Sequence, residues 1–203
     1  MVDDRNEDPR PLGYVDKVER IYRVLLSRGL GQPSWYRVAK EAAVAYGWAH
    51  RMMRGLERDG LLEGREVVDP GSLFARWASR RDRRVYREYH VREPADLIRE
   101  AGMDHALTGY FAESLIGQYL FPRYHEVYVR EEDAAAWHEL LTSRGLVGRG
   151  NVQLIVADEH VFYDRQEVDG WPLVSVQQVI VDLYRTGVEC AEAADLLVGR
   201  LYP

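Results

Sequence analysis

Basic and aromatic side chains gather between residues 35 and 65, in the first third of the chain. Arginine can pair with a guanine edge or a phosphate, and tyrosine or histidine can contact phosphate, so such a set is typical of a DNA-binding surface. Arg51, Arg54 and Arg58 are the strongest candidates for a helix that reads bases, with phosphate contacts from the helix before it. The complete candidate set is Arg37, Lys40, Tyr46, Trp48, His50, Arg51, Arg54, Arg58 and Arg65.

A second basic cluster follows, with aromatic residues interleaved and one acidic residue, Asp82, among its arginines. Its members are Arg76, Arg80, Arg81, Arg83, Arg84 and Arg87. Such charges could contact phosphates, and the resulting affinity would fall steeply with salt. The alternative is a solvated face that pairs with the acidic second half of the chain. The cluster is therefore a candidate accessory DNA surface.

Catalytic motifs are absent from the sequence, which has no phosphate-binding glycine loop, dinucleotide fingerprint or nucleophile elbow. The six histidines are scattered, and one cysteine makes a structural zinc site implausible. Asp104 and Glu126 could hold the metal of a nuclease, since paired carboxylates do that work. Surface or helix-capping roles suit both residues better. We therefore expect no enzyme, no metal and no cofactor.

The charge balance divides the chain into two unlike parts. Over all 203 residues the net charge is −6, with 46% hydrophobic and 30% charged residues, which is ordinary for a soluble globular protein. Residues 1–92 carry 19 Lys+Arg against 14 Asp+Glu, whereas residues 93–203 carry 8 against 19. This asymmetry favours a DNA-facing half joined to an acidic half, although acidic surfaces also serve solubility alone.

Cellular location is indicated by what the sequence lacks. A single cysteine, Cys190, is typical of a protein from the reducing cytoplasm. The polar, mixed-charge residues 1–10 do not resemble a secretion signal, and no apolar run approaches the length of a membrane span. We expect a cytoplasmic protein with no membrane association.

The elements that must position the basic residues are legible in residues 12–68. Apolar positions repeat at intervals of three and four over residues 14–28, which predicts an amphipathic helix. Ser34 is a good N-cap for a helix over 35–42, and a third helix is expected to end before Gly60. Residues 61–67 then fit two short strands around a turn. Together these elements predict an N-terminal winged helix-turn-helix.

Residues 69–203 predict a second domain of mixed α and β structure, so the expected fold class is α+β. Helices are expected over residues 70–80, 94–99, 110–120, 131–144, 175–186 and 188–201. Strands are expected over residues 84–90, 126–130, 151–156 and 161–163. Periodicity does not yield the order of the strands.

Four short motifs of the second half occur in an order that carries a family resemblance. They lie at residues 107–112 (LTGYFA), 127–129 (VYV), 174–183 (VSVQQVIVDL) and 192–197 (EAADLL). With the preceding helices, the stretch 14–201 resembles the AbiEi family of antitoxin regulators from type IV toxin–antitoxin systems. One departure is Ile180-Val181, where the family often has a tyrosine-leucine pair.

The resemblance implies a transcriptional repressor that binds double-stranded DNA at inverted repeats in its own operator. It further implies an antitoxin that counters a nucleotidyltransferase-like toxin without a stable complex. Helix-turn-helix proteins commonly occupy two half-sites, so a homodimer or cooperative binding is expected. Two alternatives remain: a metal-dependent nuclease using Asp104 and Glu126, and a winged-helix protein-interaction module that does not bind DNA.

Overall fold

Short helices and a hairpin form the N-terminal part of the structure. The computed structural model describes residues 16–27, 33–80 and 85–203. The first elements are α1 (Lys17–Ser27), α2 (Trp35–Glu41), α3 (Tyr46–Arg58), β1 (Leu62–Glu63), β2 (Glu66–Val67) and α4 (Pro70–Ala78). We call residues 16–80 the helical module. The predicted order of three helices and a hairpin, followed by a helix near residue 70, is confirmed.

Local capping explains where these helices begin. The Ser34 hydroxyl accepts a hydrogen bond from the Arg37 backbone N–H at 3.2 Å, which caps α2 as predicted. Asp69 caps α4 in the same way through the Ser72 N–H at 2.9 Å, and Pro70 occupies the first helical turn. These signals lie within a few residues of each helix start, which is why the sequence reveals them.

The rest of the described chain alternates strands and helices. Its elements are β3 (Arg87–Val91), α5 (Pro94–Glu100), β4 (Ala106–Thr108), α6 (Gly109–Ile116), β5 (His125–Val129), α7 (Ala134–Ser143), β6 (Gly145–Val147), β7 (Val152–Val156), η1 (Glu159–Phe162), β8 (Gln166–Val168), β9 (Trp171–Leu173), α8 (Val176–Tyr184) and α9 (Val188–Leu201). Among the described residues, seven strands form one sheet in the order β6-β3-β7-β5-β4-β9-β8. The sheet is mixed, since β5 pairs parallel with β7 and antiparallel with β4. The fold is therefore α+β, as expected.

Three predicted elements of this second part were wrong in kind or extent. Residues 159–162 form the 3-10 helix η1 rather than a strand, because the Asp158 carboxylate accepts the His160 N–H and starts a helical turn. Helix α6 ends at Ile116, because the Glu113 carboxylate binds the backbone N–H groups of the turn that follows. Helix α7 begins at Ala134 rather than at residue 131. The short strands β4, β6, β8 and β9 were not predicted.

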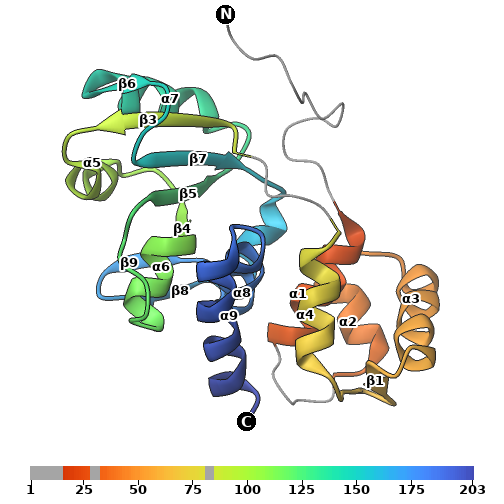
Figure 1. The fold of residues 1–203 in the computed structure, drawn as a ribbon. Coiled ribbons are helices and arrows are strands. Elements are labelled where there is room, and N and C mark those ends of the chain that lie inside the picture. The colour runs from red at the N-terminus through yellow and green to blue at the C-terminus, as the bar shows by residue number, and fades with distance from the viewer. Residues whose placement is uncertain (1–15, 28–32, 81–84) are drawn as a thin grey trace, which may run out of the picture.

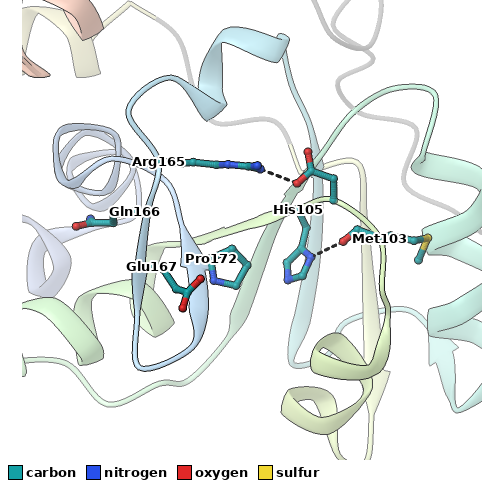
Figure 2. A pocket seen from close by; sticks show the side chains of 7 residues that line it. Met103, His105, Arg165, Gln166, Glu167 and Pro172 are labelled. Carbon is teal, nitrogen blue, oxygen red and sulfur yellow. Dashed lines mark hydrogen bonds and ion pairs between the residues drawn. The ribbon is translucent and has the colours of Figure 1, made fainter.

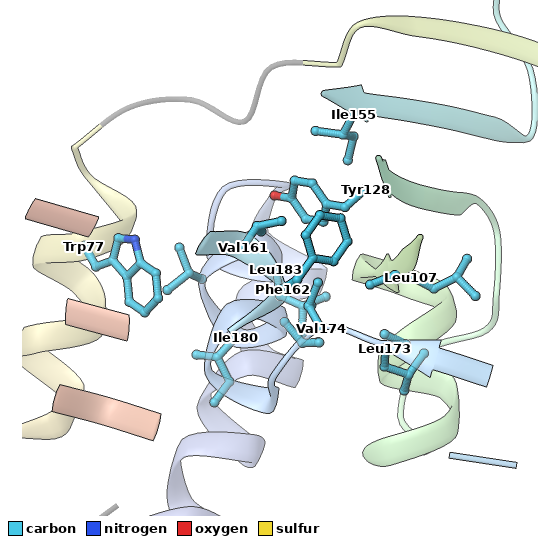
Figure 3. Packing of buried hydrophobic residues seen from close by; sticks show 14 of the residues in the cluster. Trp77, Leu107, Tyr128, Ile155, Val161, Phe162, Leu173, Val174, Ile180 and Leu183 are labelled. Carbon is cyan, nitrogen blue, oxygen red and sulfur yellow. The ribbon is translucent and has the colours of Figure 1, made fainter. Parts of the chain in front are cut away.

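Helices α8 and α9 stand between the sheet and the helical module, as Figure 1 shows. Residues of α8 are buried almost throughout, and one continuous apolar core runs from the module to the sheet. Figure 3 follows that core from Trp77 of α4, past Ile180 and Leu183 of α8, to Leu107 and Tyr128 of the sheet. The core therefore joins the two parts of the molecule.

Helix α4 packs against α1 and also against α8 and α9. The sequence analysis assigned residues 12–68 and 69–203 to two domains, which places α4 in the second. Since α4 contacts both parts, the boundary after residue 68 stays a prediction.

Candidate nucleic-acid interface

Helix α3 presents one stripe of outward-facing residues and one buried stripe. Gly47, Arg51, Arg54 and Arg58 follow one another at intervals of four, three and four residues, which places them on one face of a helix. All four are exposed. The opposite face consists of buried residues, which are Ala49, Met53 and Leu56. Met52 is half-buried beside them.

The three arginines of this stripe differ in their partners. Arg54 forms an ion pair with Glu57 at 2.9 Å, a pair that the solvent-exposed position makes weak. Within the described parts of the chain, Arg51 and Arg58 have no ion pair. Their guanidinium groups are thus available to an anionic partner without breaking a strong contact.

The turn between α2 and α3 is tight because small residues line it. Ala39 and Ala42 are buried where the two helices meet. Ala43 has a φ of 52°, and its N–H donates to the Lys40 carbonyl at 3.2 Å. A residue in this left-handed conformation reverses the chain within one turn of helix, so α3 is brought directly across α2.

Candidate phosphate contacts lie on the exposed side of α2. Lys40 and Arg37 are both exposed, and the Arg37 Nε donates to the Glu41 carboxylate at 2.8 Å. This pair is an i,i+4 contact at the end of the helix. Within residues 16–27, 33–80 and 85–203, Arg37 therefore has an ion-pair partner and Lys40 has none.

An aromatic cluster covers the N-terminal ends of α2 and α3. The Tyr46 ring lies 6.2 Å from the Tyr36 ring and 5.9 Å from the His50 ring, between ring centroids. His50 in turn meets the edge of Trp35 at 4.9 Å. Tyr36 and Tyr46 are well exposed, whereas Trp48 is half-buried against the core. Tyr46 and His50 thus flank the arginine stripe, and Trp48 serves packing more than contact.

A side chain of α2 binds the turn of the β1–β2 hairpin. The Trp35 indole Nε1 donates to the Gly64 carbonyl at 2.9 Å. Gly64 lies at the hairpin turn with a φ of 61°, and Arg65 is exposed beside it. Arg65 is therefore carried on the same side of the module as the N-terminal end of α2.

The accessory basic cluster is divided in the structure. Arg76 and Arg80 form ion pairs within the module, with Asp59 at 2.5 Å and Asp16 at 3.0 Å. Arg87 lies on strand β3 of the sheet, over the Tyr86 ring and within 3.3 Å of the His138 ring. The remaining members lie outside the described residues, and they are Arg81, Arg83 and Arg84. The described members of the cluster therefore do not form one continuous surface of unpaired positive charge.

Asp104 and Glu126, the candidate nuclease carboxylates, are engaged with other groups. Asp104 accepts hydrogen bonds from Arg130 and from Arg165, and these two guanidinium groups lower the pKa of Asp104 although burial opposes them. Glu126 is buried on β5 and accepts the Tyr110 N–H at 2.6 Å, so it caps α6. Among the described residues no cluster of three or more metal-ligating side chains occurs.

A shallow pocket of about 320 Å³ lies between the turn before β4 and the β8–β9 hairpin (Figure 2). Its lining residues are Met103, Asp104, His105, Arg165, Gln166, Glu167 and Pro172. The charge of Asp104 is balanced by Arg165, and His105 Nδ1 hydrogen-bonds the Met103 carbonyl at 2.8 Å. Burial lowers the pKa of His105. The pocket therefore holds paired charges and a neutral imidazole, which favour no particular reaction.

A buried polar network was not predicted. Asp182 of α8 accepts hydrogen bonds from the hydroxyls of Thr108 and Tyr128 at 2.7 and 3.1 Å. It also accepts from the Gln178 side chain, whose oxygen binds the guanidinium of fully buried Arg23 at 2.8 Å. Asp182 and Thr108 belong to the sequence motifs quoted above, but nothing in those motifs reveals that they meet across 74 residues.

Comparison with known proteins identifies no relative of this chain: no family model, no curated protein and no solved structure matches it. In the part of the chain that the structure describes, no helix is long and apolar enough to cross a membrane. Function must therefore be argued from the sequence and the geometry of this chain.

Proposed function

We propose that this chain is a DNA-binding transcriptional repressor whose helix α3 reads the major groove. The observation that carries the proposal is the stripe of Arg51, Arg54 and Arg58 on the face of α3 opposite to its buried residues. A recognition helix needs both faces, because one anchors it in the core while the other reaches base edges.

The surroundings of α3 support the same function. Short α2 precedes it across a tight turn at Ala43, and a hairpin follows it, which is the element order of a winged helix-turn-helix. Lys40, Arg37 and Arg65 flank the stripe from α2 and from the hairpin. Phosphate contacts at such flanking positions fix the register of a recognition helix on the duplex.

The distribution of charge also favours this orientation. The basic excess lies in residues 1–92, and the acidic excess in residues 93–203. In Figure 1, α3 lies at the edge of the molecule away from the sheet. DNA bound at α3 would therefore meet the basic part first, and the acidic part would face away from the phosphates.

Beyond DNA binding, we propose the role that the ordered C-terminal motifs imply, that of an AbiEi-type antitoxin. In this role the chain would bind inverted repeats upstream of its own gene, as a homodimer or cooperatively. It would also counter a nucleotidyltransferase-like toxin without forming a stable complex. The support is the order of the motifs at residues 107–112, 127–129, 174–183 and 192–197.

A gel-shift on the duplex directly upstream of the gene tests the DNA-binding proposal. Unlabelled random duplex serves as competitor, and salt is raised from about 50 to 200 mM, over which phosphate-dependent binding weakens by orders of magnitude. We expect a specific shift that survives the competitor and weakens with salt. No specific shift at the lowest salt would contradict the proposal and favour a winged helix that binds a protein instead.

A further inference from the structure

Glu41 is the last residue of α2, a position that helix energetics do not favour. The C-terminal end of a helix carries partial negative charge, so a carboxylate there is destabilising. The pair with Arg37 has the basic residue first, which is the weaker order for an i,i+4 contact. Contacts outside α2 must therefore account for the placement of Glu41.

Those contacts come from the segment around η1 in the second part of the chain. The Tyr163 hydroxyl donates to the Glu41 Oε2 atom, while the Arg37 Nε donates to Oε1 at 2.8 Å. The Glu41 backbone carbonyl lies 2.9 Å from the His160 Nε2 atom. The rings of His160 and Tyr163 are stacked, 5.0 Å apart between centroids. The stacked side chains of Tyr163 and His160 thus hold the Glu41 carboxylate and the Glu41 backbone carbonyl, respectively.

That stack is itself anchored from α1. The Arg23 guanidinium contacts His160 Nδ1 at 3.0 Å, and Arg20 forms an ion pair with Asp158 at 2.5 Å. A guanidinium can only donate, so Nδ1 accepts and Nε2 carries the proton that it donates to the Glu41 carbonyl. Burial and the neighbouring Arg23 lower the pKa of His160 to about 4, which keeps this ring neutral near pH 7. The His160 ring that binds the Glu41 carbonyl is therefore fixed in one orientation and one protonation state.

From this geometry we propose that Glu41 is an internal competitor for Arg37, held in place by Tyr163, so that a DNA phosphate and its carboxylate compete for the Arg37 guanidinium. The inference rests on the proposed DNA binding and deepens it. Tyr163 is then a positioning residue that lies outside the helical module. Through it, the C-terminal part of the chain lowers the affinity of the module for DNA.

The substitution Glu41→Gln tests the competition in the full-length chain, with the upstream duplex as the probe. An exposed ion pair contributes about 0.3–1 kcal/mol, so its removal should raise DNA affinity about two- to fivefold. One additional phosphate contact should also steepen the salt dependence by about 0.9 in its logarithmic slope. Tyr163→Phe removes only the hydroxyl that holds Glu41. It should also raise DNA affinity, by a smaller factor than Glu41→Gln does.

Two controls separate competition from a general effect of charge. In an Arg37→Ala background, Glu41→Gln should bring no gain, because the contested guanidinium is gone. Glu139→Gln makes the same chemical change at an exposed position of α7 and should leave affinity unchanged. A gain that persists without Arg37, or no gain at all from Glu41→Gln, would overturn the inference.

The outcomes also separate this inference from the proposed function. If the unsubstituted chain binds its upstream duplex specifically but Glu41→Gln changes nothing, only the competition is wrong. If the unsubstituted chain shows no specific binding, the proposed function itself fails.

Discussion

Arg51 and Arg58 differ from most arginines of the helical module in what their guanidinium groups contact. Arg20, Arg76 and Arg80 bind aspartates, and Arg23 is buried against Gln178. These residues hold the module together and bind it to η1 and α8. Composition alone cannot make this distinction, because it depends on carboxylates distant in the sequence. The basic character of the region was therefore predictable from the sequence. Which of its arginines form internal contacts and which remain available to a ligand was not.

Trp35 offers a test of how the hairpin is positioned. Trp35→Phe keeps an aromatic ring but removes the indole N–H that binds the Gly64 carbonyl. We expect a loss of about 0.5–1.5 kcal/mol in the free energy of unfolding and weaker DNA binding through a displaced Arg65. Urea unfolding and the gel-shift measure the two effects. Unchanged values in both would show that the hairpin is positioned without Trp35.

At the scale of elements, prediction succeeded where the signals are local. Ser34 and Gly60 mark a helix start and a helix end within a few residues of the positions that they determine. One miss was itself local: residues 161–163 were predicted as a strand, yet the Asp158 carboxylate accepts the His160 N–H two residues on and starts a 3-10 helix. Prediction also failed where a side chain acts over a distance. Glu126 was considered a metal ligand, yet the start of α6 folds onto it.

Gly109 shows how strictly the start of α6 is determined. Its φ is 57°, and a Cβ atom at this position would lie 1.6 Å from the Glu126 carboxylate that caps the helix. Gly109→Ala should therefore lower the free energy of unfolding by about 2 kcal/mol or more, through strain and a lost cap. The urea midpoint measures the loss.

The matched control for this substitution is Gly199→Ala in α9. Gly199 is exposed, and no atom lies within 4 Å of an added Cβ. Alanine favours a helix interior over glycine by about 0.5–1 kcal/mol, so this variant should be as stable as the original chain or more so. Equal losses from the two substitutions would contradict the described geometry of Gly109.

Across the whole molecule, polar contacts join the helical module to the C-terminal ends of α8 and α9, which pack between it and the sheet. Arg185, the C-cap residue of α8, binds Glu19 of α1 at 2.8 Å, with both side chains almost fully buried. The Tyr202 hydroxyl near the C-terminus donates to the Leu26 carbonyl at 2.7 Å. Each contact spans well over 100 residues, so no local pattern predicts it. The orientation of α3 relative to the sheet depends on such contacts.

His160 makes this junction sensitive to pH. Its pKa in the folded chain, about 4, lies below the ordinary value of 6.5, so the unfolded chain binds more protons between these values. The contribution of His160 to stability is complete above about pH 6.5 and decreases as the pH falls towards 4.

Urea unfolding at pH 7 and pH 5 measures that contribution. The unsubstituted chain should lose more stability between the two pH values than His160→Gln, whose side chain does not titrate. His105 and His125, whose pKa values are also lowered by burial, are present in both chains and cancel in the comparison. Equal losses in the two chains would contradict the burial of a neutral His160.

Replacing two outward arginines of α3 at once tests whether this helix binds DNA. Arg51 and Arg54 are exposed, so replacing both by alanine should leave the urea midpoint nearly unchanged. In the gel-shift on the upstream duplex, the double variant should bind at least about tenfold more weakly, because each base contact contributes about 1–3 kcal/mol. A folded double variant with the affinity of the original chain would contradict the assignment of α3 as the DNA-reading helix.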